Sequence, residues 1–200
     1  MAEQYFTSNP TSEHEYSKFE TEILGNTVCF HTDSGVFSRD GLDFGTRTLL
    51  EALPGLYGRV LDRGCGWGAV GVYVGKKYPE TEIVMSDVNE RAMELAQKNL
   101  RENGVSNAKV FKSDAMDDVP GTFDFILTNP PIRAGKAVIY KMFDQASERL
   151  NEGGALYVVI RKQQGAPSAK THLQEKFGHV EVIAKDKSYW IIECKKETEE

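Results

Sequence analysis

The chain has 200 residues, of which 40% are apolar and 27% charged, and these values are ordinary for one globular domain with a full-sized core. The net charge of −6 argues against a broadly basic nucleic-acid-binding surface, and the three cysteines have neither metal-site spacing nor the even number of a disulfide framework. The sequence lacks both an apolar run of about 18 residues and a signal-peptide pattern at residues 1–10, so we expect a reduced, cytoplasmic setting without membrane contact.

Charge is distributed unevenly along the chain. Residues 1–58 carry nine acidic and three basic side chains, whereas residues 133–170 carry seven basic and three acidic ones, a local balance of +4. A local basic face can bind a phosphate backbone even when the whole protein is acidic. Two interpretations of the 133–170 segment stay open, an RNA-facing surface and ordinary solvated helix faces.

The N-terminal quarter predicts small elements rather than a separate core. Residues 1–18 are polar and mixed, which indicates an extended or loosely docked arm. Two short strands at 22–24 and 27–31 flank Gly25-Asn26, which favours a β-hairpin. The segment 44–53 predicts a helix that ends before a Pro-Gly pair.

From residue 59 onward the pattern alternates strand and helix. The expected strands are 59–62, 82–86, 109–112, 123–127, 155–160, 180–184 and 189–193. The expected helices are 69–77, 89–103, the segment around 138–150 and 168–177. Their inner faces are predicted to carry Ala92, Leu95, Ala96 and Asn99 in one helix and Val138, Met142, Ala146 and Leu150 in another.

This alternation predicts an α/β fold with a mostly parallel seven-stranded sheet and helices on both faces. The connection between the last two strands is too short for a crossover helix, so they must be antiparallel. We expect one domain over residues 19–196, preceded by the arm and followed by a short acidic tail at 197–200.

A glycine-rich turn follows the 59–62 strand. Gly64, Gly66 and Gly68 allow the chain to turn tightly beneath a ligand, at a junction typical of nucleotide-binding folds. Asp62 directly precedes this turn, and its carboxylate would repel a pyrophosphate but attract a cation. Asp87 ends the second strand, where an acid can accept hydrogen bonds from ribose hydroxyls or stabilise a helix N-terminus.

The second motif is Asn129-Pro130-Pro131, which directly follows the fourth strand of the alternating pattern. Together with the glycine turn it resembles the motif of class I S-adenosylmethionine-dependent methyltransferases that act on an amino nitrogen. The resemblance implies a Rossmann-like fold with S-adenosylmethionine as cofactor and no metal. The implied cofactor contacts are Asp62, Gly64, Cys65, Gly66, Asp87, Val88, Asp114, Ala115 and Asn129, with the acid at 114 on the adenine amino group.

The chemistry of amino methylation explains the second motif. The lone pair of an exocyclic amino group is delocalised into its ring and must be localised towards the incoming methyl group. The Asn129 side-chain oxygen and the Pro130 carbonyl can accept the two N–H bonds, while Pro131 stiffens the turn. A rigid surface turn is the alternative, and pyrimidine C5 methylation is excluded because no cysteine lies near this motif in the sequence.

A longer resemblance covers residues 17–195. The segments 35–46 and 129–136 resemble the catalytic half of ribosomal RNA small-subunit methyltransferase C and its compact single-domain relatives. This resemblance implies guanine-N2 methylation of small-subunit ribosomal RNA, and it implies that Phe37, Arg39 and Thr46 fold over the cofactor or the target base. Two departures are expected to matter: the short arm replaces an additional N-terminal domain, and Ile132 replaces a stacking aromatic, so that stacking must come from elsewhere, such as Phe37.

Other functions remain alternatives to RNA methylation. A protein glutamine-amide methyltransferase uses a similar motif, usually with tyrosine after the second proline, and a non-catalytic cofactor-binding RNA-associated protein is a further alternative. A small-molecule methyltransferase is disfavoured because no lid domain is evident. The predicted RNA-facing residues lie beyond the fourth and fifth strands of the pattern, at sheet ends that border ligand crevices. They are Ile132, Arg133, Lys136, Arg161 and Lys162, together with Arg39.

Overall fold

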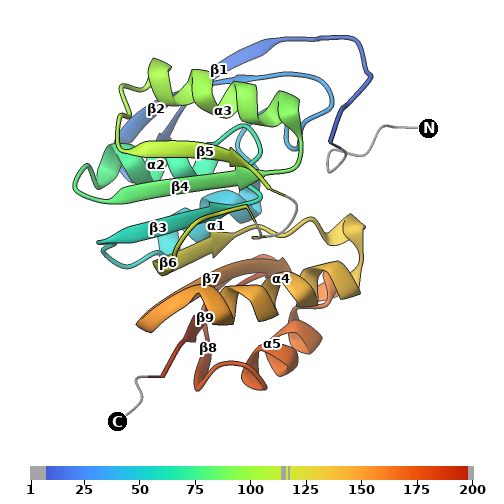
Figure 1. The fold of residues 1–200 in the computed structure, drawn as a ribbon. Coiled ribbons are helices and arrows are strands. Elements are labelled where there is room, and N and C mark those ends of the chain that lie inside the picture. The colour runs from blue at the N-terminus through green and yellow to red at the C-terminus, as the bar shows by residue number, and fades with distance from the viewer. Residues whose placement is uncertain (1–7, 114–115, 117, 198–200) are drawn as a thin grey trace.

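The structure, a computed structural model, describes residues 8–113, 116 and 118–197. A seven-stranded sheet in the order β5-β4-β3-β6-β7-β9-β8 forms its centre (Figure 1). The strands are β3 (Arg59–Arg63), β4 (Glu82–Asp87), β5 (Ala108–Lys112), β6 (Phe123–Thr128), β7 (Leu150–Arg161), β8 (His179–Asp186) and β9 (Tyr189–Lys195). The first five in this order run parallel, and β9 is antiparallel to both of its neighbours. The predicted fold class is confirmed.

Helices cover both faces of the sheet. On one face lie α1 (Phe44–Ala52), α2 (Ala69–Lys77) and α3 (Glu90–Glu102), and on the other lie α4 (Lys136–Arg149) and α5 (Ala166–Gln174). Side chains alternate along each strand, so Val60 packs with the first group and Leu61 with the second. None of the helices in the described part of the chain has the length and apolar character that crossing a membrane requires.

The predicted inner face of α4 is partly wrong. Val138 is 47% exposed, and Leu150 already belongs to β7, whereas Ile139 and Phe143 enter the core beside α5. The predicted face was rotated by about one residue, because an exposed valine fits the same helical spacing as a buried one.

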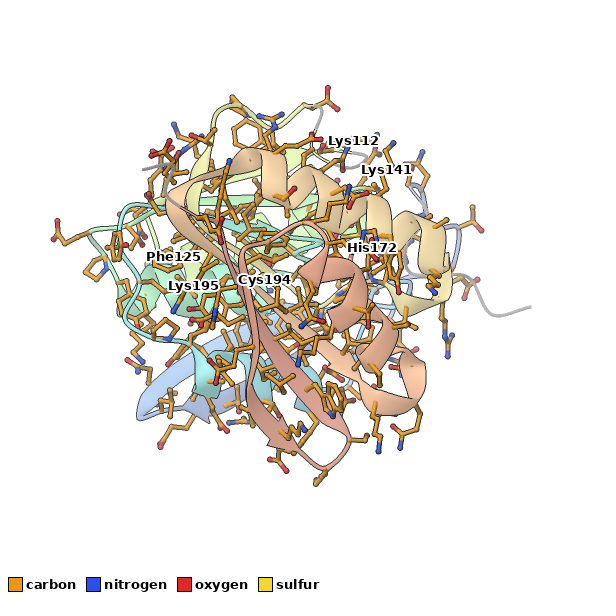
Figure 2. All side chains as sticks on the ribbon, turned by 90° about the horizontal axis from the view of Figure 1, so that it is seen from below. Lys112, Phe125, Lys141, His172, Cys194 and Lys195 are labelled. Carbon is orange, nitrogen blue, oxygen red and sulfur yellow. The ribbon has the colours of Figure 1, made fainter. Side chains whose placement is uncertain are left out.

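On this side of the sheet His172 of α5, labelled in Figure 2, pairs with Asp144 of α4 at 2.8 Å.

The N-terminal hairpin docks onto α3 through two asparagine side chains. The hairpin consists of β1 (Ser17–Ile23) and β2 (Asn26–Thr32), both longer than the sequence pattern indicated. Asn99 accepts a hydrogen bond from the His31 backbone N–H at 2.7 Å and donates to the His31 carbonyl at 3.0 Å. Asn103 makes the same pair of bonds with Cys29, at 3.0 and 2.7 Å. Each amide therefore pairs with the main chain of β2 as a neighbouring strand would.

The segment before the hairpin lies against the N-terminal end of α3. The Arg91 guanidinium donates to the carbonyls of Ser12 and Pro10 at 2.9 and 3.3 Å. Asp33 is buried beside them, and although burial opposes it, hydrogen bonds from the His14 ring and two backbone N–H groups lower the pKa of this carboxyl. These contacts fix the arm and the loop that follows β2 to the body of the domain.

Candidate active site

The predicted motifs meet in one cleft of about 890 Å³ at the carboxyl ends of β4, β3 and β6. The chain reverses its direction of travel across the sheet at β3, and the crevice beside such a switch point is the usual ligand site of open α/β sheets. The predicted residues that line it are Phe37, Thr46, Asp62, Gly64, Cys65, Gly66, Asp87, Val88, Asn129, Pro130, Pro131, Ile132, Arg133 and Arg161. Asp114 and Ala115 lie outside the described residues, so their predicted contacts with adenine stay predictions.

The glycines of the turn have two different roles, one in the cleft and one in the packing of the core. Gly64 and Gly66 have φ of +68° and +54°, and a Cβ added to either would meet no heavy atom within 4 Å. Their missing side chains therefore leave open space that a ligand can fill. A Cβ on Gly68 would instead lie 3.0 Å from Met85 and 3.2 Å from the Ala96 side chain. Its predicted place beneath the ligand is wrong, because this third glycine allows close packing of α2.

Two acids flank this open space, the buried Asp62 and the half-buried Asp87. The Asp62 side chain accepts a hydrogen bond from the Gly71 backbone N–H at 2.8 Å, and burial, assisted by the charge of Asp87, raises its pKa to about 7. Burial also raises the pKa of Asp87, although this carboxylate accepts bonds from the N–H groups of Gly66 and Asn89 at 2.8 and 2.9 Å. Each carboxylate retains acceptor capacity beyond these bonds, so the pair favours a ligand that brings positive charge or hydroxyl donors.

The thiol of Cys65 is buried next to these acids. Burial and the two neighbouring carboxylates raise the pKa of Cys65 well above its ordinary value, so the side chain stays a neutral thiol. Because the thiolate is the nucleophilic form, this cysteine is unsuited to covalent catalysis. Cys65 therefore lines the cleft as a neutral side chain.

Asn129 also lines the cleft, and its side chain is held in one orientation. Its amide nitrogen donates to Asp43 Oδ2 at 3.1 Å and to Thr46 Oγ1 at 3.0 Å. Among the described residues, neither its side-chain oxygen nor the Pro130 carbonyl has a hydrogen-bond partner. The Pro131 carbonyl is engaged, because it accepts from Ala134 N–H at 2.8 Å in η1 (Ile132–Ala134). Two acceptors are thus available side by side in the chain.

Several cleft residues were missed by the sequence patterns. Asp43 reads as the N-cap of α1, and its side chain does accept from Thr46 N–H, but it also contacts Asn129 from 86 positions away. Tyr189 is the first residue of β9 and lines the cleft. The Arg161 guanidinium lies 4.6 Å from the centroid of its ring. No local pattern marks either residue, because their roles depend on contacts between distant segments.

Arg63 is a buried charge in the wall of the cleft. An arginine at the end of a strand can usually extend its side chain to solvent, but this residue is only 4% exposed and lines the cleft. Its guanidinium donates to the Met142 carbonyl at 3.3 Å and to Gln145 Oε1 at 3.1 Å. Hydrogen bonds to α4, rather than snorkelling, compensate the burial of this charge.

The predicted RNA-facing residues do not all border the cleft. Arg133 and Arg161 line it, and Lys141 of α4 joins them, whereas Lys136 and Lys162 do not. Arg39 forms ion pairs with Glu15 and Asp40 and lies outside the lining. Contact of any of these residues with a substrate stays a prediction.

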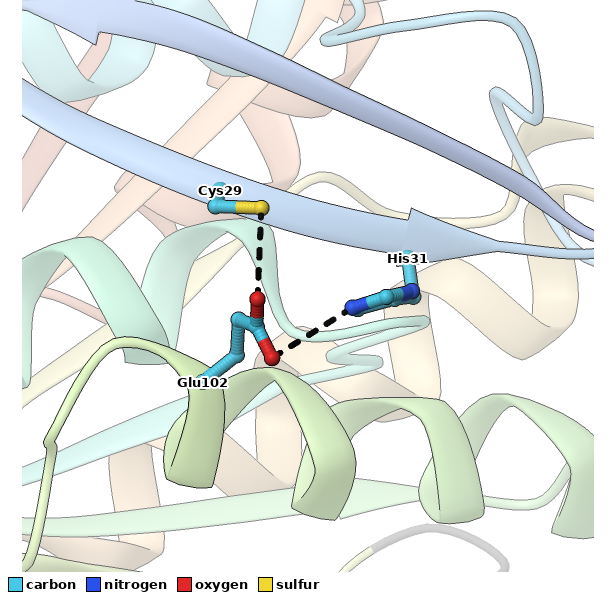
Figure 3. A group of neighbouring side chains, drawn as sticks. All are labelled: Cys29, His31 and Glu102. Carbon is cyan, nitrogen blue, oxygen red and sulfur yellow. Dashed lines mark hydrogen bonds and ion pairs between the residues drawn. The ribbon is translucent and has the colours of Figure 1, made fainter.

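A separate cluster of ligand-type side chains lies between the hairpin and α3. Cys29, His31 and Glu102 place their ligand atoms within 4.8 Å of one another (Figure 3). The Lys18 ammonium already pairs with the Glu102 carboxylate at 2.8 Å, and Glu102 is 3.6 Å from the His31 ring. A basic side chain therefore supplies the positive charge here, and we interpret the cluster as part of the hairpin contact.

Comparison with known proteins agrees with this geometry. The family model of the methyltransferase small domain matches residues 27–193. The uncharacterized protein YbxB of Bacillus subtilis is 42% identical over 200 residues, which cover 98% of this chain and 100% of YbxB. Ribosomal RNA small subunit methyltransferase C of Vibrio parahaemolyticus is 33% identical over 192 residues, which cover 94% of this chain and 55% of that protein.

A solved structure of a ribosomal RNA methyltransferase has a similar fold. The T. thermophilus 16S rRNA N2 G1207 methyltransferase (RsmC), in complex with AdoMet and guanosine, has a TM-score of 0.83 at 29% identity. The match covers 94% of this chain and 52% of that one. The chain therefore spans about half the length of the named ribosomal RNA methyltransferases that it matches.

Proposed function

Because the chain belongs to the methyltransferase small domain family, we propose that it is an S-adenosylmethionine-dependent enzyme that methylates the exocyclic N2 amino group of a guanine in RNA. The observation that carries the proposal is the fixed amide of Asn129, whose nitrogen is bound to Asp43 and Thr46 while its oxygen is left to accept. Two relatives are named as methyltransferases of small-subunit ribosomal RNA, and their names support that RNA as the substrate.

The acids and glycines of the cleft fit this cofactor. The buried carboxylate of Asp62, with its raised pKa, is suited to the cationic amino group of the methionine moiety. Asp87 at the end of β4 is suited to the ribose hydroxyls, and the open space over Gly64 and Gly66 gives the ligand room against the backbone. A pyrophosphate would instead face two carboxylates, which disfavours a dinucleotide.

S-adenosylmethionine would supply the methyl group of its sulfonium: the new N–C bond would form at the target nitrogen while the S–C electron pair passes to sulfur, and one proton of that nitrogen would pass to water. Asn129 Oδ1 and the Pro130 carbonyl accept the two N–H bonds of the target and hold its lone pair towards the methyl group. Because the methylated nitrogen is acidic, a strong base is not required. The side chains place the reactants, and placement accounts for much of the acceleration.

The mouth of the cleft suits a nucleic acid. Arg133, Lys141 and Arg161 are exposed, line the cleft from three different elements and can contact the phosphates that flank a flipped base. Tyr189 offers a ring in addition to Phe37, which is 38% exposed, so two aromatic side chains can replace the stacking group that is missing at Ile132.

The experiment is a methyl-transfer assay with the full chain and radiolabelled S-adenosylmethionine. Naked small-subunit ribosomal RNA and assembled small subunits, both from cells lacking this protein, serve as substrates, and the products are digested to nucleosides. We expect the label in N2-methylguanosine, and we expect it to be lost with Asn129→Ala. Label in methyladenosine, or in a glutamine of a ribosomal protein, would contradict the proposal and identify the correct acceptor.

A further inference from the structure

Asp43 has one oxygen engaged and one available. Oδ2 accepts hydrogen bonds from the Thr46 backbone N–H at 2.9 Å, from Thr46 Oγ1 at 3.4 Å and from Asn129 Nδ2 at 3.1 Å. Among the described residues, no group donates a hydrogen bond to Oδ1, and Asp43 lines the cleft. The carboxylate therefore presents a charged acceptor beside the amide that faces the target.

The engaged oxygen determines which way the Asn129 amide points. An ionised carboxylate only accepts hydrogen bonds, so the end of the amide that faces Asp43 must be the nitrogen. The Thr46 hydroxyl donates to the same carboxylate, which leaves its lone pairs to accept from Asn129. Both contacts hold the nitrogen end of the Asn129 amide against Asp43 and Thr46, so the oxygen is the end that is left to accept from a ligand.

The hydrogen bond between Asn129 Nδ2 and Asp43 Oδ2 places the two side chains side by side in the cleft, and each keeps one oxygen that can accept. Of the four RNA bases, only guanine carries an exocyclic amino group next to a ring N–H; in adenine and cytosine the amino group adjoins a ring nitrogen that is itself an acceptor. We propose that Asp43 Oδ1 accepts the guanine N1–H and that this carboxylate selects guanine as the base whose amino group reaches Asn129. The proposal rests on the proposed function and adds the residue that determines its specificity.

The carboxylate also disfavours the competing acceptors. The ring nitrogen of adenine or cytosine would place a lone pair against a negative charge, and a buried acceptor facing an acceptor is strongly rejected. The carbonyl of a glutamine side chain, which adjoins its amide nitrogen, would meet the same repulsion. The charge of Asp43 would therefore exclude adenine, cytosine and glutamine side chains, even where the shape of the cleft alone would admit them.

The test compares guanine with 2-aminopurine in an RNA oligonucleotide that spans the methylated position. 2-Aminopurine keeps the 2-amino group but has a bare N1, so wild-type protein should prefer guanine by about 100-fold or more in kcat/KM. Asp43→Asn can donate an N–H to that N1, so the preference should fall below about tenfold. 2-Aminopurine also lacks the guanine O6, but this loss is common to both proteins and cancels in the ratio of their preferences.

Two further variants separate recognition from orientation. Thr46→Val removes a partner of the Asn129 amide but keeps the carboxylate, so it should slow transfer to both bases and leave the preference unchanged. Glu51→Gln removes one exposed carboxylate from the same helix away from the cleft and should change neither. Asparagine caps a helix as well as aspartate does, so Asp43→Asn should keep α1, and thermal unfolding checks this.

The outcomes distinguish this inference from the proposed function. A wild-type preference for guanine that survives unchanged in Asp43→Asn would overturn the role of Asp43 and leave guanine methylation standing. A change of preference in Thr46→Val as large as that in Asp43→Asn would show that amide orientation, rather than N1 recognition, selects the base. Wild-type transfer to adenine, or to no base at all, would overturn both.

Discussion

The affinity of the cleft for S-adenosylmethionine should increase with pH, and Asp62 should be the cause. Burial raises the pKa of this carboxyl to about 7 in the cofactor-free protein, so below that pH it is largely protonated. A cationic amino group requires the carboxylate, so binding at lower pH must first remove the proton. With a pKa of about 7, the dissociation constant should be about eightfold larger at pH 6.0 than at pH 7.5.

Isothermal titration calorimetry with S-adenosylmethionine or its demethylated product measures this dependence directly. The range ends at pH 7.5 because the α-amino group of the ligand itself loses its proton at about pH 8. Asp62→Asn should bind more weakly at pH 7.5 and lose the slope, while Glu51→Gln should keep it. A wild-type affinity that is constant between pH 6.0 and 7.5 would refute the reasoning, because Asp62 would then not exchange its proton for the ligand's charge.

Three other predictions follow from the cleft. Asn129→Ala should reduce methyl transfer by roughly 10²–10³ in single-turnover assays, because its amide oxygen is expected to accept a hydrogen bond from the target amino group. Cofactor affinity and thermal stability should stay near wild type. An unfolded variant would instead favour a purely structural role for this turn. Asp87→Ala should weaken cofactor binding at least about tenfold by calorimetry, and unchanged affinity would remove it from the site. Charge reversal at both Arg133 and Arg161 should weaken RNA binding in filter assays and flatten its salt dependence without altering cofactor affinity; unaffected binding would place RNA on another face.

The alternating part of the fold could be predicted because its signals are local. The helix expected over 89–103 corresponds to α3, and Asn89 caps it by accepting a hydrogen bond from Ala92 N–H. The apolar strand 155–160 lies inside β7, and the two last strands are antiparallel as their short connection required. Boundaries were less accurate: α5 begins at Ala166 rather than 168, since a proline at the first turn of a helix is compatible with an earlier start.

Site residues that lie within one short sequence motif could be predicted. Site residues that depend on contacts between distant segments could not. Asp62 and Asp87 could be predicted because each lies at or next to the end of a buried strand, and Asn129 because it directly follows one. Asp43 was missed because its signal is that of an ordinary helix cap. Tyr189 was missed because only the antiparallel placement of β9 beside β7 brings it next to Arg161.

The asparagines of α3 have a consequence for the solution behaviour of the protein. A two-stranded ribbon has two free edges, and each can recruit a strand from another molecule. Asn99 and Asn103 occupy the main-chain groups of Cys29 and His31, so the outer edge of β2 offers no template for such pairing. The helix thus does more than anchor the hairpin: its two amides end the ribbon on that side and protect it against intermolecular β-aggregation.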